Sequence, residues 1–304
     1  MTTGMTITSA IQQFLSELPR SAKTKSTYAE GLRAFLKIVG EDAPLSLETY
    51  KKFLLATAGV PVSTQRTYAA PVRSMLIRIG RLAPADISMY TKDYGQRSGA
   101  RFPRYDEGAL DKLINYANSL SGDIIALRDR ALIITLVDTG LRIHEACNLR
   151  RGDIDWMNAR TVLIGKGDKQ AVVRFSERSM QAMKDYLAAR AALDGNSGKP
   201  LASLPLFARH DKSAGKKVYP LSTKGAWAAF KACLEDAGID KGDVRVHDTR
   251  HYFCTTTLRA SDNNLRVTQE LARHGSIQMT ARYTHLSNAD LDASYHDIFN
   301  QKGK

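Results

Sequence analysis

The sequence has few cysteines and no long hydrophobic run. Its 304 residues include three cysteines, Cys147, Cys233 and Cys254, widely spaced among Ala and Leu in helical patterns. Such cysteines are typical of small buried side chains in a reducing compartment, so we expect no disulfide. No apolar run approaches the roughly eighteen residues that span a bilayer, and residues 1–10 lack the basic-then-apolar pattern of an export signal. These absences argue against export and membrane insertion, and we expect a cytoplasmic protein.

Acidic residues are outnumbered by basic ones. The chain has 31 Asp and Glu against 44 Lys and Arg, which gives a formal net charge of +13 and a pI near 9.6. This excess of positive charge favours a polyanionic partner, and without a membrane segment nucleic acid is the expected one. A hydrophobic content of 43% is ordinary for a globular protein, and the length is sufficient for two domains. No internal repeat is evident.

Residues 1–94 predict a small helical domain. Apolar residues recur at helical spacing in four segments, with Ser63 as the expected N-cap of the last. Basic residues near helix starts and on polar faces could meet DNA phosphates together with free helix N–H groups, although a solvated basic face would give the same pattern. The DNA-binding candidates in this domain are Lys23, Lys25, Arg66 and Arg73.

A basic linker is expected at residues 95–104. Gly95, Gly99 and Pro103 interrupt the helical pattern there. Three arginines in this segment are further candidates for contact with a DNA backbone. They are Arg97, Arg101 and Arg104.

Residues 105–304 predict a second, mixed domain. An apolar helix closes at Gly140, and two β-type runs flank the Gly-containing turn of residues 165–169, which indicates a hairpin. Further helices follow, separated by a Gly/Pro/Lys-rich stretch over residues 195–220 that we expect to be a flexible loop. A final helix is expected over residues 287–300. The predicted fold class is therefore mainly α with a small β-hairpin or sheet.

Six polar residues in this domain could together hold and attack a phosphodiester. Each has an ordinary explanation when taken alone, such as a solvated cation or a half-buried aromatic ring. Their order along the chain is more informative than any one of them. The six are Arg142, Lys166, His247, Arg250, His274 and Tyr283.

The chain resembles the tyrosine recombinase family of phage integrases and Xer-type recombinases. The resemblance is carried, in order, by TGLRIHEACNLRRGDID (139–155), GKGDK (165–169), HDTRH (247–251) and ARHGSIQMTARYTHLS (272–287). One departure is Arg273, which precedes His274 where the family pattern has glycine. The resemblance implies a helical core-binding domain at 1–94 and a catalytic domain at 105–304.

The resemblance also implies a reaction that fits these residue types. Tyr283 would attack the phosphate and form a 3′-phosphotyrosyl bond, without ATP, metal or other cofactor. Two guanidiniums, of Arg142 and Arg250, would neutralise the phosphate oxygens. The resemblance also implies that His247 and His274 form hydrogen bonds to the phosphate. Lys166 would protonate the leaving 5′ oxygen, with Lys169 as the alternative, and Glu145 would orient a cation.

The expected function is site-specific DNA recombination on double-stranded sites, by a tetramer associated with the nucleoid. A type IB topoisomerase would use the same nucleophile chemistry, and a non-enzymatic DNA-binding regulator would share the charge and the helices. The i, i+4 pair His247 and His251 also resembles half of a zinc metallopeptidase motif, but Asp248 stands where that motif has glutamate.

Overall fold

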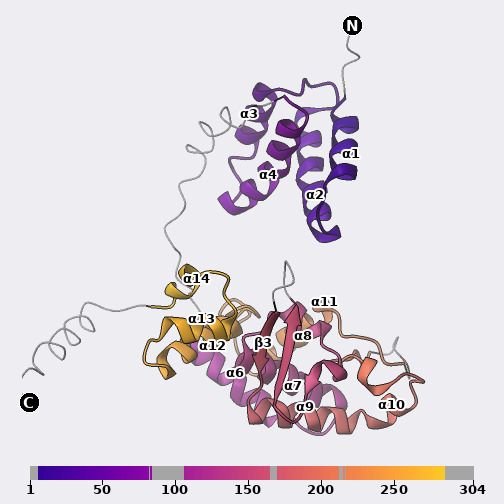
Figure 1. Ribbon diagram of the computed structural model, residues 1–304, viewed down its shortest axis with the longest axis vertical. Helices are drawn as coiled ribbons and strands as arrows, with labels where there is room; N and C mark the ends of the chain where they lie inside the picture. The colour runs from indigo at the N-terminus through magenta and orange to yellow at the C-terminus, as the bar shows by residue number, and fades with distance from the viewer. Residues whose placement is uncertain are drawn as a thin grey trace, which may run out of the picture. The chain divides into compact units, whose positions relative to one another are not determined.

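The computed structural model describes residues 6–81, 83, 106–164, 170–211, 215 and 217–284. These residues belong to two compact units, one within residues 1–100 and the other within residues 101–304 (Figure 1). The first is helical, and the second combines helices with a three-stranded antiparallel sheet. This confirms the predicted fold class. No helix in the described part of the chain is long and apolar enough to cross a membrane.

The described residues of the first unit form four helices around one apolar core. They are α1 (Ile7–Glu17), α2 (Ala22–Val39), α3 (Leu47–Ala56) and α4 (Val62–Arg78). The rings of Phe35 and Phe53 meet edge to face at 5.3 Å and join α2 to α3. Gly31 lets α2 and α4 approach closely, because a Cβ at that position would lie 2.8 Å from Cγ of Pro71.

Three of these helices begin at a side-chain cap and the fourth does not. Thr6, Ser21 and Ser46 accept hydrogen bonds from backbone N–H groups in the first turns of α1, α2 and α3. The prediction that Ser63 caps α4 is wrong. The N-cap is Pro61, and Ser63 lies inside the first turn.

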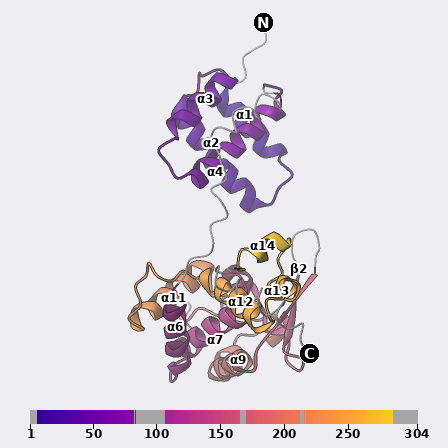
Figure 2. The same ribbon diagram turned by 90° about the vertical axis from the view of Figure 1, so that its left-hand side faces the viewer.

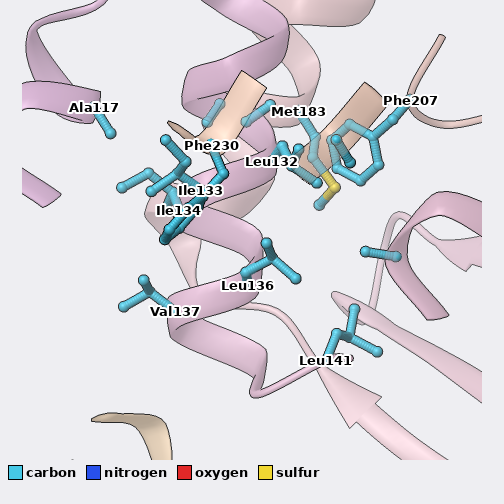
Figure 3. Packing of buried hydrophobic residues seen from close by; sticks show 14 of the residues in the cluster. Ala117, Leu132, Ile133, Ile134, Leu136, Val137, Leu141, Met183, Phe207 and Phe230 are labelled. Carbon is cyan, nitrogen blue, oxygen red and sulfur yellow. The ribbon is translucent and has the colours of Figure 1, made fainter. Parts of the chain in front are cut away.

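The second unit contains most of the helices and the sheet. The α-helices among its described residues are α6 (Glu107–Ser119), α7 (Ile124–Thr139), α8 (Ile143–Asn148), α9 (Glu177–Ala189), α10 (Ala191–Gly195), α11 (Thr223–Asp236), α12 (Asp248–Ala260), α13 (Leu265–Ala272) and α14 (Ile277–Ala281). Helix α7 is central because its apolar side chains point to several sides and pack against α6, α9, α11 and α12. Figure 3 shows this core around Leu132, Ile134 and Leu136, with Met183 of α9 and Phe230 of α11.

The predicted hairpin is present as two paired strands. β2 (Arg160–Ile164) and β3 (Gln170–Arg174) are antiparallel, with Arg160 opposite Arg174 and Ile164 opposite Gln170. A short strand that the sequence did not predict, β1 (Ile154–Asp155), pairs with the other edge of β2. Figures 1 and 2 show α12, α13 and α14 grouped together on this unit, and α12 also packs on α7.

Part of the stretch predicted as a flexible loop is instead core. Leu206 and Phe207 are fully buried, and the Leu206 N–H donates to the carbonyl of Leu149. Isolated bridges also pair Arg150 with Pro205 and Ala208 with Pro220. The apolar run LPLFA (204–208) within the Gly/Pro/Lys-rich stretch accounts for the difference, because burying it stabilises the segment.

Candidate active site

Four chain segments supply the candidate site in the second unit. Helix α7 ends at Gly140 in the left-handed conformation (φ 58°), and Arg142 follows closely as the N-cap of α8. His247 is the N-cap of α12, and α13 ends directly before Arg273. Tyr283 directly follows Arg282, the C-cap of α14. Hydrogen bonds between these segments bring their side chains together.

Arg250 lies at the centre of these contacts. Its side chain is buried, and its two terminal nitrogens donate to the carbonyls of Gly140 and Ala272, which ties α12 to the ends of α7 and α13. Burial and the nearby Arg142 guanidinium lower the pKa of Arg250. The site therefore holds cations that an incoming anion would stabilise.

Arg142 and Glu145 form a pair at the start of α8. The Arg142 N–H donates to Oε2 of Glu145 at 2.8 Å, and its guanidinium Nη1 donates to Oε1 at 2.9 Å. Burial of Glu145 opposes its ionisation, but these bonds and the charge of Arg273 outweigh it, so the pKa of the carboxyl is lowered. The Arg142 side chain is 37% exposed, so the carboxylate holds it while it still faces solvent.

Arg273 is a third guanidinium at the same place. Its backbone is left-handed (φ 57°, ψ 42°), and its side chain, 7% exposed, donates to the carbonyls of Thr139 at 3.2 Å and Gly140 at 3.1 Å. It also approaches Oε2 of Glu145 at 3.5 Å. Burial lowers the pKa of Arg273 to about 10. The departure from the family pattern thus falls at a position whose backbone favours glycine, and it adds positive charge.

His274 is buried beside the expected nucleophile. Its Nδ1 lies 2.9 Å from Oγ1 of Thr280, and its ring is nearly parallel to that of Tyr283, with centroids 6.1 Å apart. Burial and the arginines Arg250 and Arg142 lower the pKa of His274 to about 4. The imidazole is therefore neutral at physiological pH.

Tyr283 is half-buried, and its phenol contacts a histidine. The Tyr283 oxygen lies 2.6 Å from Nδ1 of His251, and the two ring centroids are 5.6 Å apart. Burial raises the pKa of Tyr283, with further contributions from the Cys254 thiol that outweigh the charge of Arg250. The phenol therefore keeps its proton in this state.

His247 lies at the exposed edge of the site. Its ring meets that of His251 edge to face at 4.8 Å. Desolvation and the charges of Arg250 and Arg142 lower the pKa of His247. Five of the six predicted polar residues thus lie together: Arg142, His247, Arg250, His274 and Tyr283.

The remaining predicted residues lie elsewhere or outside the described residues. Lys166, Lys169, Arg97, Arg101, Arg104 and the expected helix 287–300 all fall outside the described residues. In the first unit, Lys23 and Lys25 are in the first two turns of α2, and Arg66 and Arg73 are on α4; Lys23 and Arg66 are exposed and the other two are half-buried.

Two residues of the site were not assigned to it from the sequence. The sequence indicates His251 only as a candidate metal ligand, and Arg273 only as a departure from the family pattern. Their signals were the i, i+4 spacing of His251 from His247 and the helix C-cap position of Arg273. Among the described residues, no group of three or more His, Cys, Asp or Glu could hold a metal ion. The three cysteines are free and buried, as predicted.

Residues 104–290, more than half of the chain, match the phage integrase family, so the chain belongs to that family. It is similar to the tyrosine recombinase XerD of Corynebacterium glutamicum, with 39% identity over 164 residues, 54% of this chain and 50% of that protein. The XerD of Lacticaseibacillus casei is 34% identical over 176 residues, 57% and 55% of the two chains. The chain thus spans about half the length of the curated relatives it matches.

Solved structures show the same fold. A Tn1549 transposon integrase in complex with transposon right end DNA has a TM-score of 0.70 at 17% identity, covering 97% of this chain and 100% of that one. XerH recombinase bound to its difH substrate has a TM-score of 0.67 at 18% identity, covering 96% and 84%. The predicted tyrosine recombinase fold type is therefore confirmed.

Proposed function

We propose that this protein is a site-specific DNA recombinase that cleaves and rejoins DNA strands through a 3′-phosphotyrosyl intermediate. The observation that carries the proposal is the phenol of Tyr283 beside a cluster of guanidiniums in a chain of the phage integrase family. The relatives' names and the DNA in the related complexes support a DNA substrate.

The cluster has the charge that phosphoryl transfer requires. Arg142, Arg250 and Arg273 surround one carboxylate, Glu145, which leaves an excess of two positive charges. A scissile phosphodiester would supply the missing negative charge, and the added charge of its transition state would be stabilised further. We assign Arg142 and Arg250 to the phosphate, and Glu145 to holding Arg142 in place.

The other roles follow from chemistry. His247 and His274, as neutral imidazoles, donate hydrogen bonds to the phosphate oxygens. Lys166 protonates the departing 5′ oxygen, with Lys169 as the alternative on the same turn. The phosphotyrosyl bond conserves the energy of the broken linkage, so the reaction needs neither ATP nor a metal.

The chain's organisation supports DNA binding by two parts. We assign residues 1–94 to core binding, 95–104 to a linker along the DNA backbone and 105–304 to catalysis. Exchange of strands between two sites takes four active subunits, so we propose a tetramer on DNA, in the nucleoid. Many phosphates would be neutralised, and DNA affinity should fall steeply as salt is raised.

Covalent capture tests the proposal even though the target site is unidentified. The full-length protein is incubated in EDTA, without nucleotide, with randomly nicked genomic DNA from the organism that carries the gene. A nick just beyond the scissile phosphate lets the short 5′-hydroxyl strand diffuse away and traps the adduct. Denaturing purification and sequencing of the attached strands should show one recurring 3′ end within an inverted repeat.

Matched tyrosine variants decide whether the adduct is the expected one. Tyr283→Phe should retain DNA binding and give no adduct, because it deletes only the attacking oxygen. Tyr252→Phe removes a phenol that bonds Asp111 on the same unit, and it should form the adduct normally. Adduct formation by the Tyr283→Phe variant would refute the assignment. Joining of the captured strand to a second duplex, rather than relaxation of supercoils alone, distinguishes a recombinase from a topoisomerase.

A further inference from the structure

The hydrogen bond between Tyr283 and His251 has no part in the roles assigned above. His251 follows Arg250 on α12 and lies one turn after His247. Its Nδ1 is 2.6 Å from the phenol oxygen. Because a phenol that keeps its proton donates, Nδ1 is the acceptor and the imidazole is neutral with its hydrogen on Nε2. A neutral nitrogen at this distance from a nucleophile has the geometry of a general base.

We propose that His251 is the general base that takes the proton of Tyr283 as the phenol oxygen attacks the scissile phosphate. The inference rests on the proposed function. The Tyr283 oxygen forms a bond to phosphorus as its proton passes to Nδ1 of His251. The bond from phosphorus to the 5′ oxygen breaks, and that oxygen takes a proton from the general acid. On rejoining, the 5′ hydroxyl attacks phosphorus and returns its proton to the deprotonated general acid. The bond from phosphorus to the Tyr283 oxygen breaks, and the imidazolium of His251 gives its proton to the leaving phenolate.

The other two histidines are less well placed for this step. The Nδ1 of His274 faces Thr280, and its Nε2 lies 3.9 Å from the Cys254 thiol. His247 contacts the ring of His251. Among the described histidines, His251 is the one with a hydrogen bond to the nucleophile.

Substrate binding would make this base stronger. Burial lowers the pKa of His251 to about 4, together with His247 and the charges of Arg282 and Arg250. A phosphodiester bound by Arg250 offsets the charge of that guanidinium, so the pKa of His251 rises when DNA arrives. Without DNA the pair remains neutral, and Tyr283, whose pKa is raised by burial, stays protonated. The nucleophile is thereby activated only in the complex.

The test measures single-turnover adduct formation on the nicked duplex recovered by the capture experiment. A second version of that duplex carries sulfur in place of the 5′ bridging oxygen, a leaving group that needs little protonation. The rate of adduct formation on this duplex therefore depends on activation of the Tyr283 nucleophile and little on the general acid. His251→Phe keeps a ring of similar size, and His251→Asn keeps a hydrogen-bonding group near Nδ1 but no base. Both should lower the rate by about 10²–10⁴-fold on both duplexes.

A second Tyr–His pair provides the control. Tyr186 and His210 form a similar bond, 2.8 Å from Oη to Nε2, and the pKa of His210 is also lowered to about 4, by burial and then by Arg128 and Arg190. His210→Asn should lose stability and keep the adduct rate per folded molecule. If loss of a buried Tyr–His bond were sufficient to slow cleavage, this variant would be slowed as well.

Rescue and pH separate a base from a packing role. Imidazole added to His251→Gly should restore adduct formation in proportion to its neutral form. The wild-type rate on the sulfur duplex should fall as pH drops through the pKa of His251 in the complex, and His251→Asn should lack that fall. A wild-type rate for His251→Asn would overturn the inference while the proposed function stands. No adduct from the wild-type protein would overturn both.

Discussion

Replacing Arg273 by glycine and by alanine should separate the effect of its charge from that of its backbone. Both variants lose the guanidinium that bonds Thr139 and Gly140. They differ in the left-handed backbone, φ 57°, which glycine adopts freely and alanine does not. We therefore expect equal losses of adduct formation and unequal stabilities.

The size of the stability difference follows from two opposing terms. A left-handed conformation costs a residue with a Cβ about 1–2 kcal/mol. Glycine avoids this cost, but it lowers the free energy of unfolding by roughly 0.4–1 kcal/mol because a glycine makes the unfolded chain more flexible. Arg273→Gly should therefore have a free energy of unfolding about 1 kcal/mol larger than Arg273→Ala, and a Tm about 2–4 °C higher.

Comparison with the wild-type protein adds a third term. Both variants lose two hydrogen bonds from a cation, which lowers the free energy of unfolding by about 1.5–3 kcal/mol for each bond. Both variants also remove a buried charge, whose burial lowers the pKa of Arg273 to about 10, and this removal raises the free energy of unfolding by about 3 kcal/mol. The alanine variant should be less stable than the wild type by about 2 kcal/mol, and the glycine variant by about 1 kcal/mol.

Urea unfolding followed by tryptophan fluorescence measures these values in the full chain. The sequence has two tryptophans, Trp156 and Trp227, and both lie in the second unit, so the signal reports that unit alone. An alanine variant as stable as the glycine variant would show that residue 273 is not left-handed. Unequal adduct rates per folded molecule would show that the backbone at residue 273 also affects the reaction.

The remaining predictions concern stability around the site and core. Gly140→Ala should unfold the second unit several kcal/mol more easily and abolish adduct formation, because a Cβ there would lie 2.5 Å from the Phe253 ring and φ is 58°; wild-type urea midpoints would contradict this. The pKa of His274 is about 4 when folded, against 6.5 ordinarily, so below pH 6.5 the unfolded state binds more protons at this residue; His274 alone should lower the free energy of unfolding by about 3 kcal/mol between pH 6.5 and 4, in addition to the falls from His251 and His210, whose pKa values are lowered likewise. His274→Gln should flatten that part of the pH profile. Asp194→Asn should lower the free energy of unfolding by about 3–5 kcal/mol, because it leaves the charge of the fully buried Arg190 uncompensated. A urea midpoint equal to that of the wild type would refute this prediction.

Local patterns predicted most of the elements. Helical spacing of apolar residues located α1–α4, α7, α9 and α11–α14, and the two β-type runs around residues 165–169 located β2 and β3. The order of the polar motifs indicated the family that the comparisons confirm. These features depend on neighbours within one or two turns, or on sequence alone. The roles assigned to individual site residues stay predictions.

Features that depend on distant partners were missed. Arg190 occurs at the end of an amphipathic helix, where an arginine normally faces solvent, but it is buried because the carbonyls of Pro205 and Leu206 and the Asp194 carboxylate satisfy its donors. The burial of LPLFA (204–208) likewise needs the α7–α9 core to receive it. No spacing rule within the segment predicts either result.

The same distinction explains Arg273. The sequence marks it only as an arginine where the family pattern has glycine. The fold brings the carbonyls of Thr139 and Gly140, from the end of α7, within reach of its guanidinium, and Gly140 also accepts from Arg250. One carbonyl thus holds two cations whose mutual repulsion a phosphate would relieve, while Glu145 balances only part of their charge. A site with this excess of positive charge is least stable when no anion is bound. The same repulsion between cations that destabilises the free protein therefore favours binding of an anion beside Tyr283.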